Sequence, residues 1–423
     1  MLQYLLEKEF TINGIKIVCK VTGAPATAND GQPYVLDIPA GPGAPSTTYM
    51  AKFLQKSKSP NLKPHVILFD FPGCGQSEKS KNPEFDYTIE HFTEIAARVV
   101  ECVQDELNIG KLDLHVYGPG TPIGLNLPLH RPQWTTNQDS IQLKSIFAPN
   151  ATVGIKGTLS ADFVRQHYAY EPEFPEYIKA LDKLHTGKIT SRKAYISEYL
   201  APMAPAYSDQ YKSLPNKLLL SALKNHPDNV VKILKLFRRK ASLEIVNGFS
   251  YEVLNQFYGS QWNGFELDVA IDNFNKKPWN KNKNVYSKIP IYASYQSHDF
   301  CTSGDQHLNQ LQAMLPDVCG ILRPGKIRDF KNLIFFSKFL SGDLEKFENQ
   351  IRRDLSNRTI LKANFTPGFR KSYEEAFKSV AKLSNKSTTH YEEVVKGEPC
   401  FFKSGKHQHP VTSSASQKLE MKA

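Results

Sequence analysis

Apolar and polar residues alternate along the first 150 residues in a way that predicts strands separated by helices. The stretches "PYVLDIP" and "HVILFDFP" are short apolar runs between prolines or glycines, which is typical of buried strands in a parallel sheet. "FTINGIKIVCK" predicts two short strands joined at an Asn-Gly turn, and "LKSIFAP" predicts a further strand. Strands that alternate with helices predict an α/β fold with a mostly parallel sheet flanked by helices.

One helix in this region is predicted with well-defined ends. Within "DYTIEHFTEIAARVVECVQDELNIG" apolar residues recur three or four positions apart, and Gly110 lies where a helix C-cap is expected. The spacing predicts that one face of this helix packs on the sheet through Phe92, Ile95, Ala96, Val99, Val103 and Leu107.

The pattern changes twice further along the chain. From about Thr152 the sequence is richer in Tyr, Lys, Leu and Asn and predicts helices without strands, until "KIPIYASYQSHDF" resumes the strand pattern. We therefore predict an α/β core over 1–151 and 289–344, interrupted by a helical cap over 152–288. A C-terminal extension over 345–423 is predicted to be helical at first and disordered at its polar, Ser-rich end.

The chain is basic, and the surplus of positive charge is uneven. The 423 residues carry a net charge of +11, and from Ile321 to the end 20 Lys and Arg face 11 Asp and Glu. Such a segment is either a solvated basic surface or a contact for an anionic membrane or nucleic acid.

Cysteine use and the N-terminal sequence bear on location and cofactors. The six cysteines show no CxxC pair or regular spacing, so we predict neither a metal site nor a disulfide framework, and no motif implies a cofactor. Charged residues interrupt the N-terminal apolar segment, and no apolar run is long enough to span a membrane. We expect a cytoplasmic protein, with export by a system that needs no cleavable signal left open.

Four motifs follow the predicted strands in order: "IPAGPGAPS" (38–46), "DFPGCGQSEKS" (70–80), "VYGPGTPIG" (116–124) and "SYQSHDFCTS" (294–303). In this arrangement residues 10–345 resemble α/β-hydrolases, and more closely the proline iminopeptidase branch. The resemblance implies an oxyanion turn, a second D-x-x-G-x-G-x-S turn, a nucleophile elbow, a helical cap, a late Asp and a final Gly-His. The oxyanion turn retains Ala40, Gly41, Pro42 and Gly43, and the second turn retains Asp70, Gly73, Gly75 and Ser77.

The catalytic positions implied by the resemblance are degenerate. At the elbow, where the family has G-x-S-x-G, the alignment puts Gly120 at the position of the nucleophilic Ser and Pro122 at the following Gly. Asp299 matches the acid of the triad, but Lys326 replaces its His. Glycine provides no attacking atom, and a lysine with an ordinary pKa of about 10.4 is a poor base near neutral pH. The resemblance with these losses predicts a site that no longer performs Ser-His-Asp hydrolysis.

Other residues near the expected site could bind a ligand or replace the nucleophile. Backbone N–H groups at Gly41 and Thr121 would favour an anion, as would the basic loop with Arg323, Lys326 and Arg328. Asp299 and Lys326 could instead form a structural ion pair. The alternative nucleophiles are Thr121, Cys74 and Cys301, and His298 could face the same cleft.

Three functions remain open from the sequence. The first is a binding or regulatory protein that holds a small, anionic or peptide-like ligand in a capped pocket without hydrolysing it. The second is an active hydrolase or aminopeptidase of the proline iminopeptidase type with a non-standard nucleophile. The third is an interaction protein that acts through its basic C-terminal extension.

Overall fold

A computed structural model describes most of the chain between Gln3 and Ser384. The described residues are 3–23, 33–39, 43–48, 50, 65–82, 85–136, 141–151, 174–207, 213–237, 248–260, 267–277, 284–297, 304–324, 336 and 338–384.

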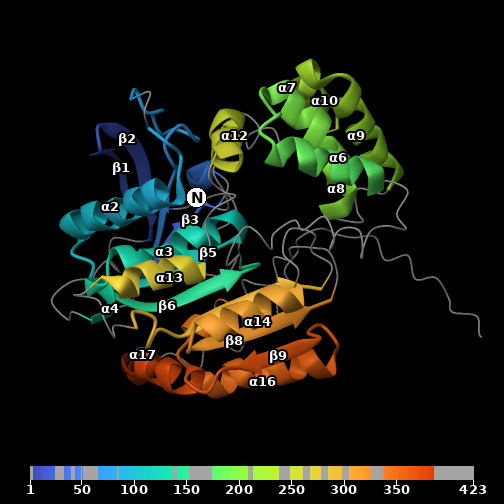
Figure 1. Cartoon of the computed structure of the whole chain (residues 1–423). Helices are drawn as coiled ribbons and strands as arrows, with labels where there is room; N and C mark the ends of the chain where they lie inside the picture. The colour runs from blue at the N-terminus through green and yellow to red at the C-terminus, as the bar shows by residue number, and fades with distance from the viewer. Residues whose placement is uncertain are drawn as a thin grey trace, which may run out of the picture.

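The centre of the molecule is one nine-stranded sheet in the order β1-β2-β4-β3-β5-β6-β7-β8-β9 (Figure 1). The six strands from β4 to β8 in this order are parallel, whereas β1, β2 and β9 are added antiparallel at the two edges. The strands are Tyr4–Ile12 (β1), Ile15–Thr22 (β2), Tyr34–Ile38 (β3), His65–Phe69 (β4), Lys111–Val116 (β5), Gln142–Pro149 (β6), Ile291–Gln296 (β7), Val318–Arg323 (β8) and Lys362–Phe365 (β9). The prediction of a mostly parallel sheet is confirmed.

The predicted Asn-Gly hairpin joins β1 to β2. Asn13 and Gly14 both have positive φ, 51° and 76°, the combination that a type I′ turn needs and that Asn and Gly tolerate best. The pairing of Ile12 with Ile15 closes the hairpin at that turn. A short local signal therefore determined both the turn and the register of the edge.

Helix α2 (Ile89–Leu107) confirms the amphipathic prediction but not its C-cap. The Thr88 hydroxyl accepts a hydrogen bond from the His91 N–H and caps the first turn. At the other end Asn108, rather than Gly110, has the left-handed conformation, with φ of 51°, and its N–H donates to the Gln104 carbonyl. Asparagine tolerates this conformation, so the helix ends two residues earlier than glycine alone suggested.

Helices cover both faces of the sheet. One face carries α2, α3 (Thr121–His130), α13 (Leu267–Lys276) and α14 (Gly304–Met314), and the other carries α16 (Leu344–Ser356) and α17 (Phe369–Ser384) (Figure 1). Alternate residues of each strand serve the two faces: Leu36 of β3 belongs to the first core and Val35 to the second. Most parallel strands are therefore buried on both sides, which explains their continuous apolar sequences.

The predicted boundary at residue 344 is wrong, because the segment beyond it completes the sheet domain. Strand β9 pairs with β8, while α16 and α17 bury Phe347, Tyr373 and Phe377 in the second core. Sequence periodicity missed β9 because it has only four residues, all half-buried, and so shows no alternation. The predicted disordered end of the extension lies outside the described residues.

The helical cap is also shorter than the predicted 152–288. Its described α-helices are Phe174–His185 (α6), Arg192–Ala194 (α7), Ala201–Tyr207 (α8), Leu214–Asn225 (α9) and Val230–Leu236 (α10), with a π-helix at Tyr195–Leu200 (η3) and a 3-10 turn at Pro227–Asn229 (η5). These elements build two small cores. Helix α12 (Tyr251–Ser260) joins the cap to the sheet domain, because its Leu254 packs in a cap core while its Val253 and Phe257 belong to the main core. Leu267 and Phe274 of α13 also belong to the main core, so α13 lies outside the cap. Among the described helices, none combines the length and the apolar character needed to cross a bilayer.

Candidate functional site

The predicted site residues follow strands whose carboxyl ends meet at one edge of the sheet. In open parallel sheets this edge is where ligands bind. Strand β7 ends at Gln296 and β8 at Arg323, so the segments with His298, Asp299 and Cys301 and with Lys326 and Arg328 continue from this edge. Those five residues, and Gly41 and Pro42 of the first turn, lie outside the described residues, and their roles stay predictions.

The second turn, residues 70–78, forms a compact loop closed by the buried carboxylate of Asp70. This carboxylate accepts hydrogen bonds from the Thr47 N–H at 2.9 Å, the Thr47 hydroxyl at 2.6 Å and the Gln76 N–H at 3.1 Å. The Ser77 hydroxyl donates to the Asp70 carbonyl at 2.7 Å. Gly75 has φ of 56°, and a Cβ there would lie 2.1 Å from an Asp70 oxygen, so the loop requires glycine at that position.

The strand-to-helix turn between β5 and α3 has the shape of a nucleophile elbow. Its strained residue is Gly118, which follows the strand closely and has φ of 52°. Gly120 has ordinary helical angles, with φ of −76°, and packs tightly: a Cβ on Gly120 would lie 2.3 Å from the Pro39 carbonyl oxygen. A nucleophile occupies the strained apex of such a turn, so the geometry places that apex at Gly118, two residues before the position that the alignment assigned.

The same turn offers no obvious oxyanion donor. In a nucleophile elbow the residue after the nucleophile contributes its backbone N–H to the oxyanion hole. After Gly118 that residue is Pro119, which has no N–H. The next two N–H groups are engaged, because Gly120 donates to the Tyr117 carbonyl and Thr121 to the Gly118 carbonyl. The expectation that the Thr121 N–H is free to bind an anion is therefore wrong.

The described end of the oxyanion turn is also engaged with protein groups. The Gly43 N–H donates to the Cys74 sulfur at 3.2 Å, and the Gly43 carbonyl accepts from the Ser250 N–H at 2.9 Å. Burial raises the pKa of the Cys74 thiol to about 12. A thiol with that pKa is not a thiolate near neutral pH, so Cys74 is a packing residue rather than a replacement nucleophile.

Comparison with known proteins agrees with the observed arrangement of sheet and helices. Residues 34–134 match a family model described as the alpha/beta hydrolase fold. No curated protein matches the sequence. Among solved structures, VinJ has a TM-score of 0.51 and 15% identity, over 82% of this chain and 99% of that one. The chain has the α/β-hydrolase fold.

Two further α/β-hydrolase-type structures are more distant. MGS-M2, an alpha/beta hydrolase enzyme from a Medee basin deep-sea metagenome library, has a TM-score of 0.47 and 14% identity, over 79% of this chain and 96% of that one. The proline iminopeptidase of Mycobacterium smegmatis has a TM-score of 0.46 and 15% identity, over 79% and 97%. All three similarities concern the fold alone.

Arg323 does not lie in the anion-binding position that the sequence suggested. It is the last residue of β8, is buried, and its Nη2 donates to the Tyr292 hydroxyl at 3.2 Å. Tyr292 belongs to the core on the α16–α17 face of the α/β-hydrolase sheet. This contact directs the Arg323 side chain into the interior between sheet and helices rather than toward the carboxyl edge.

Three polar residues beneath the two turns, Asp37, Ser46 and His115, were not predicted from the sequence. Asp37 of β3 accepts from the Ser46 hydroxyl at 3.0 Å, and its other oxygen lies 2.6 Å from His115 Nδ1 of β5. The same three residue types form a catalytic triad, but there the imidazole stands between hydroxyl and carboxylate. Here the carboxylate stands in the middle, so His115 cannot take the proton of Ser46. The trio instead ties β3 to β5 directly below the first turn and the elbow.

Two other buried hydroxyls also face carboxylates rather than imidazoles. Thr47 donates to Asp70, and Ser145 of β6 donates to Asp113 of β5 at 2.6 Å. Burial raises the pKa of Asp113 to about 7 despite this hydrogen bond. These pairs stabilise neighbouring segments and show no arrangement that activates a hydroxyl. No group of three or more His, Cys, Asp or Glu side chains in the described residues could hold a metal ion.

Two buried polar side chains at the carboxyl edge have no hydrogen-bond partner within the described part of the chain. The Thr121 hydroxyl is at the start of α3, and both amide atoms of Asn150 are just beyond β6. Asn150 has φ of 53°, and its backbone N–H donates to the Ser294 carbonyl of β7. Buried polar atoms are nearly always paired, so such orphans mark a place where water or a ligand completes the structure. No periodic pattern or motif in the sequence indicates a role for Asn150.

Proposed function

We propose that this protein binds a small or peptide-like molecule at the carboxyl edge of its sheet, beneath the helical cap, and does not hydrolyse it. The elbow carries this proposal. Its strained apex, Gly118, offers no attacking atom, and the following residue, Pro119, offers no oxyanion N–H. Nucleophilic attack and stabilisation of the resulting oxyanion are separate contributions to acyl transfer, and this turn retains the backbone shape of an elbow without either.

The degenerate triad supports the same interpretation. Lys326 stands where the family has its catalytic His, and an imidazole near neutral pKa is what such a reaction uses to move the proton. The hydroxyls of Ser46, Thr47 and Ser145 each donate to a carboxylate rather than to an imidazole. A non-standard nucleophile would therefore need a base, a donor and an attacking atom from residues that the family does not use.

The orphaned polar atoms support a ligand with amide character. A primary carboxamide has both a donor and an acceptor, and these are complementary to the carbonyl and N–H of a peptide group. Asn150 has both amide atoms buried and unpaired among the described residues, and it follows β6, the neighbour of the strand that leads into the elbow. Burying such groups unpaired is unfavourable, and a bound amide would remove that penalty.

Catalysis is tested first. The full chain is treated with a serine-reactive fluorophosphonate probe and with a panel of aminoacyl amides and esters, alongside an active proline iminopeptidase. We expect no labelling and no turnover above the buffer rate. The Gly118→Ser variant should stay inactive, because it regains an oxygen but neither base nor oxyanion N–H. Turnover by the natural chain that a single site substitution abolishes would overturn the proposal.

Binding is tested by thermal shift with aminoacyl amides, dipeptides and small carboxylates. A ligand that binds only the folded chain raises its melting temperature. We expect an amide-containing compound to do so, and the Asn150→Asp variant to bind it about tenfold more weakly, equivalent to about 1.4 kcal/mol, because the donor is lost. The matched Asn225→Asp change, on the exposed face of α9, should have no effect. Equal affinity of the two variants for the ligand would show that the Asn150 side chain does not bind it.

A further inference from the structure

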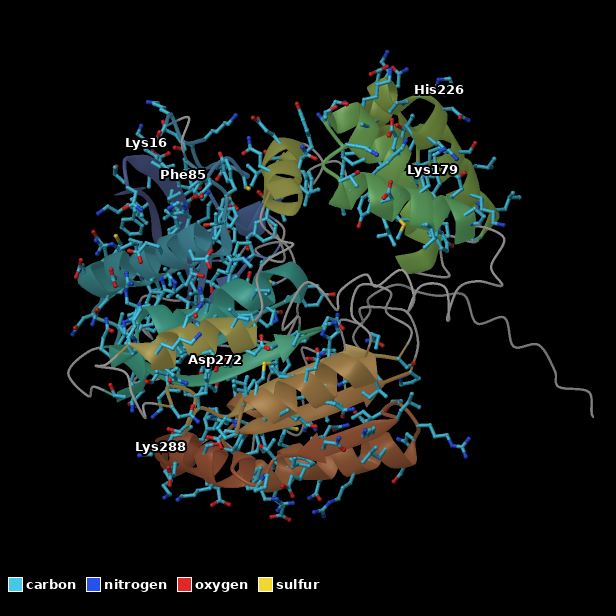
Figure 2. The ribbon with its side chains drawn as sticks, in the orientation of Figure 1. Lys16, Phe85, Lys179, His226, Asp272 and Lys288 are labelled. Atoms are coloured by element: carbon cyan, nitrogen blue, oxygen red, sulfur yellow. The ribbon has the colours of Figure 1, made fainter. Side chains whose placement is uncertain are left out.

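The paired cap helices α9 and α10 present an unusual outer surface. Their inward faces are packed against the rest of the cap. Leu219 and Leu223 of α9 and Ile233 and Leu234 of α10 belong to a small core there. The turn between them contains His226, which lies at the outer end of the helical cluster, away from the sheet (Figure 2). What the two helices present outward is therefore not needed for packing within the cap.

Helices α9 and α10 carry three exposed leucines. Leu214 and Leu218 of α9 are 72% and 56% exposed, and Leu236 of α10 is 78% exposed. Leu214 and Leu218 are four residues apart, so they project from the same side of α9. Across the whole described chain only Val269 and Leu361 are large hydrophobics with comparable exposure, and they lie on separate elements. Three of these five residues therefore belong to one helix pair.

The same helix pair is basic. Residues 214–236, the two helices and the turn between them, contain four Lys and a single acidic residue, Asp228. Asp228 is paired with Lys193 of α7 at 2.9 Å, so its charge is already compensated. Lys217, Lys232 and Lys235 are exposed, and none of the three forms an ion pair with another described residue. The surface therefore combines unpaired lysines with exposed leucines.

We propose that the α9–α10 surface docks on an anionic phospholipid bilayer. Leucines that enter the interfacial region while lysines contact anionic headgroups are the combination that interfacial helices use. The alternatives fit less well. Sites for single-stranded nucleic acid rely on exposed aromatic residues for stacking, and protein interfaces are enriched in aromatic residues and depleted in lysine. This inference is independent of the proposed ligand site, and it places membrane contact on the cap instead of the basic C-terminal extension.

Vesicle flotation with the full chain tests the proposal. We expect binding to phosphatidylcholine vesicles that contain phosphatidylserine, about tenfold weaker binding to phosphatidylcholine alone, and a decrease with added salt. Two double variants, Leu214→Ser with Leu218→Ser and Lys217→Glu with Lys232→Glu, should each lower the affinity about tenfold. All four side chains are exposed or on the helix surface, so folding should be unaffected, and melting curves check this.

Matched changes elsewhere make the test specific. Val269→Ser on α13 and Lys378→Glu on α17 alter an exposed apolar residue and an exposed lysine outside the α9–α10 surface, and both should bind as the natural chain does. The proposal is overturned if the chain binds neither kind of vesicle. It is equally overturned if the α9–α10 variants bind normally while deletion of residues 385–423 abolishes binding. Loss of binding in the lysine variant alone would indicate a cationic patch without insertion, and would overturn it too.

Discussion

Two turns at the same edge of the sheet, the second turn (residues 70–78) and the elbow, are stabilised by different interactions. The second turn is fixed by side chains, since the Asp70 carboxylate collects three hydrogen bonds inside the protein. The elbow is fixed by backbone and close packing: Gly118 accepts the strained angle, and Gly120 lies against the Pro39 carbonyl. A turn of the second kind needs no reactive side chain for its shape.

The largest loss of stability is expected at the second turn. Replacing Asp70 by Ala leaves two N–H groups and a hydroxyl, at Thr47 and Gln76, without acceptors in a buried loop. We expect the free energy of unfolding to fall by about 3–5 kcal/mol, measured by urea denaturation. Asp272→Ala, which removes an exposed carboxylate from α13, should change stability by less than about 0.5 kcal/mol. A loss below 1 kcal/mol at Asp70 would mean that water replaces the carboxylate easily.

The elbow itself is tested by serine at each of its two glycines. At Gly120 the new Cβ meets a backbone oxygen at 2.3 Å, so we expect Gly120→Ser to lower the free energy of unfolding by about 3 kcal/mol. At Gly118 the left-handed backbone conformation costs a serine about 1–2 kcal/mol. The two variants are a matched pair, compared by the same denaturation. A larger loss for Gly118→Ser would show that the left-handed angle costs more than the close contact at Gly120.

The sequence predicted the frame of the site better than its details. The Asn13-Gly14 turn, the apolar strands and the amphipathic face of α2 are local signals, and each was confirmed. The second turn could be recognised because its glycines are needed for a backbone conformation that only a few residues allow. The predicted cap boundary failed because α12 and α13 have helical patterns like those of the cap, and only packing shows that α13 belongs to the main core and that α12 contributes to both cores.

The apex of the elbow could have been found from the sequence, but by a different signal. The alignment matched glycines to glycines and so selected Gly120. A residue before proline is disfavoured in the helical region, and two residues of this turn precede a proline, Gly118 and Thr121. Of these two only the glycine accepts a positive φ readily, so Gly118 is the better candidate for the apex. The Asp37–His115 contact and the orphaned Asn150 amide had no such signal, because they depend on strand neighbours far apart in the chain.

Each region also contains a buried carboxylate, and the one below the elbow should make stability depend on pH. The pKa of Asp113 is raised by burial to about 7, well above its value in the unfolded chain. The folded protein then holds a proton that the unfolded chain has released. Stability should fall as the pH rises, by about 2 kcal/mol between pH 5 and pH 7. Asp113→Asn should remove this decrease, whereas Asp228→Asn on the exposed cap should not.

Measurement requires unfolding curves at several pH values for the natural chain and both variants. The opposite slope, with stability rising toward pH 7 and unaffected by Asp113→Asn, would show that Asp113 is ionised in the folded protein. In that case the Ser145 hydrogen bond would outweigh the cost of burial at Asp113. At Asp70, by contrast, burial raises the pKa of the carboxyl even though three hydrogen bonds oppose that effect.

The smallest expected change in stability is at Thr121, and it tests whether this hydroxyl serves the fold or a ligand. The Thr121 hydroxyl is buried and unpaired among the described residues, so in the empty protein it contributes a desolvation penalty and no hydrogen bond. Thr121→Val keeps the shape and removes that penalty, and should stabilise the chain by about 1 kcal/mol in urea denaturation. The matched Thr93→Val change removes a hydroxyl that donates to the Ile89 carbonyl and should destabilise it. If Thr121→Val is stabilising and also weakens binding of an amide ligand, the hydroxyl is retained for the ligand; if it destabilises the chain, the hydroxyl is part of the fold.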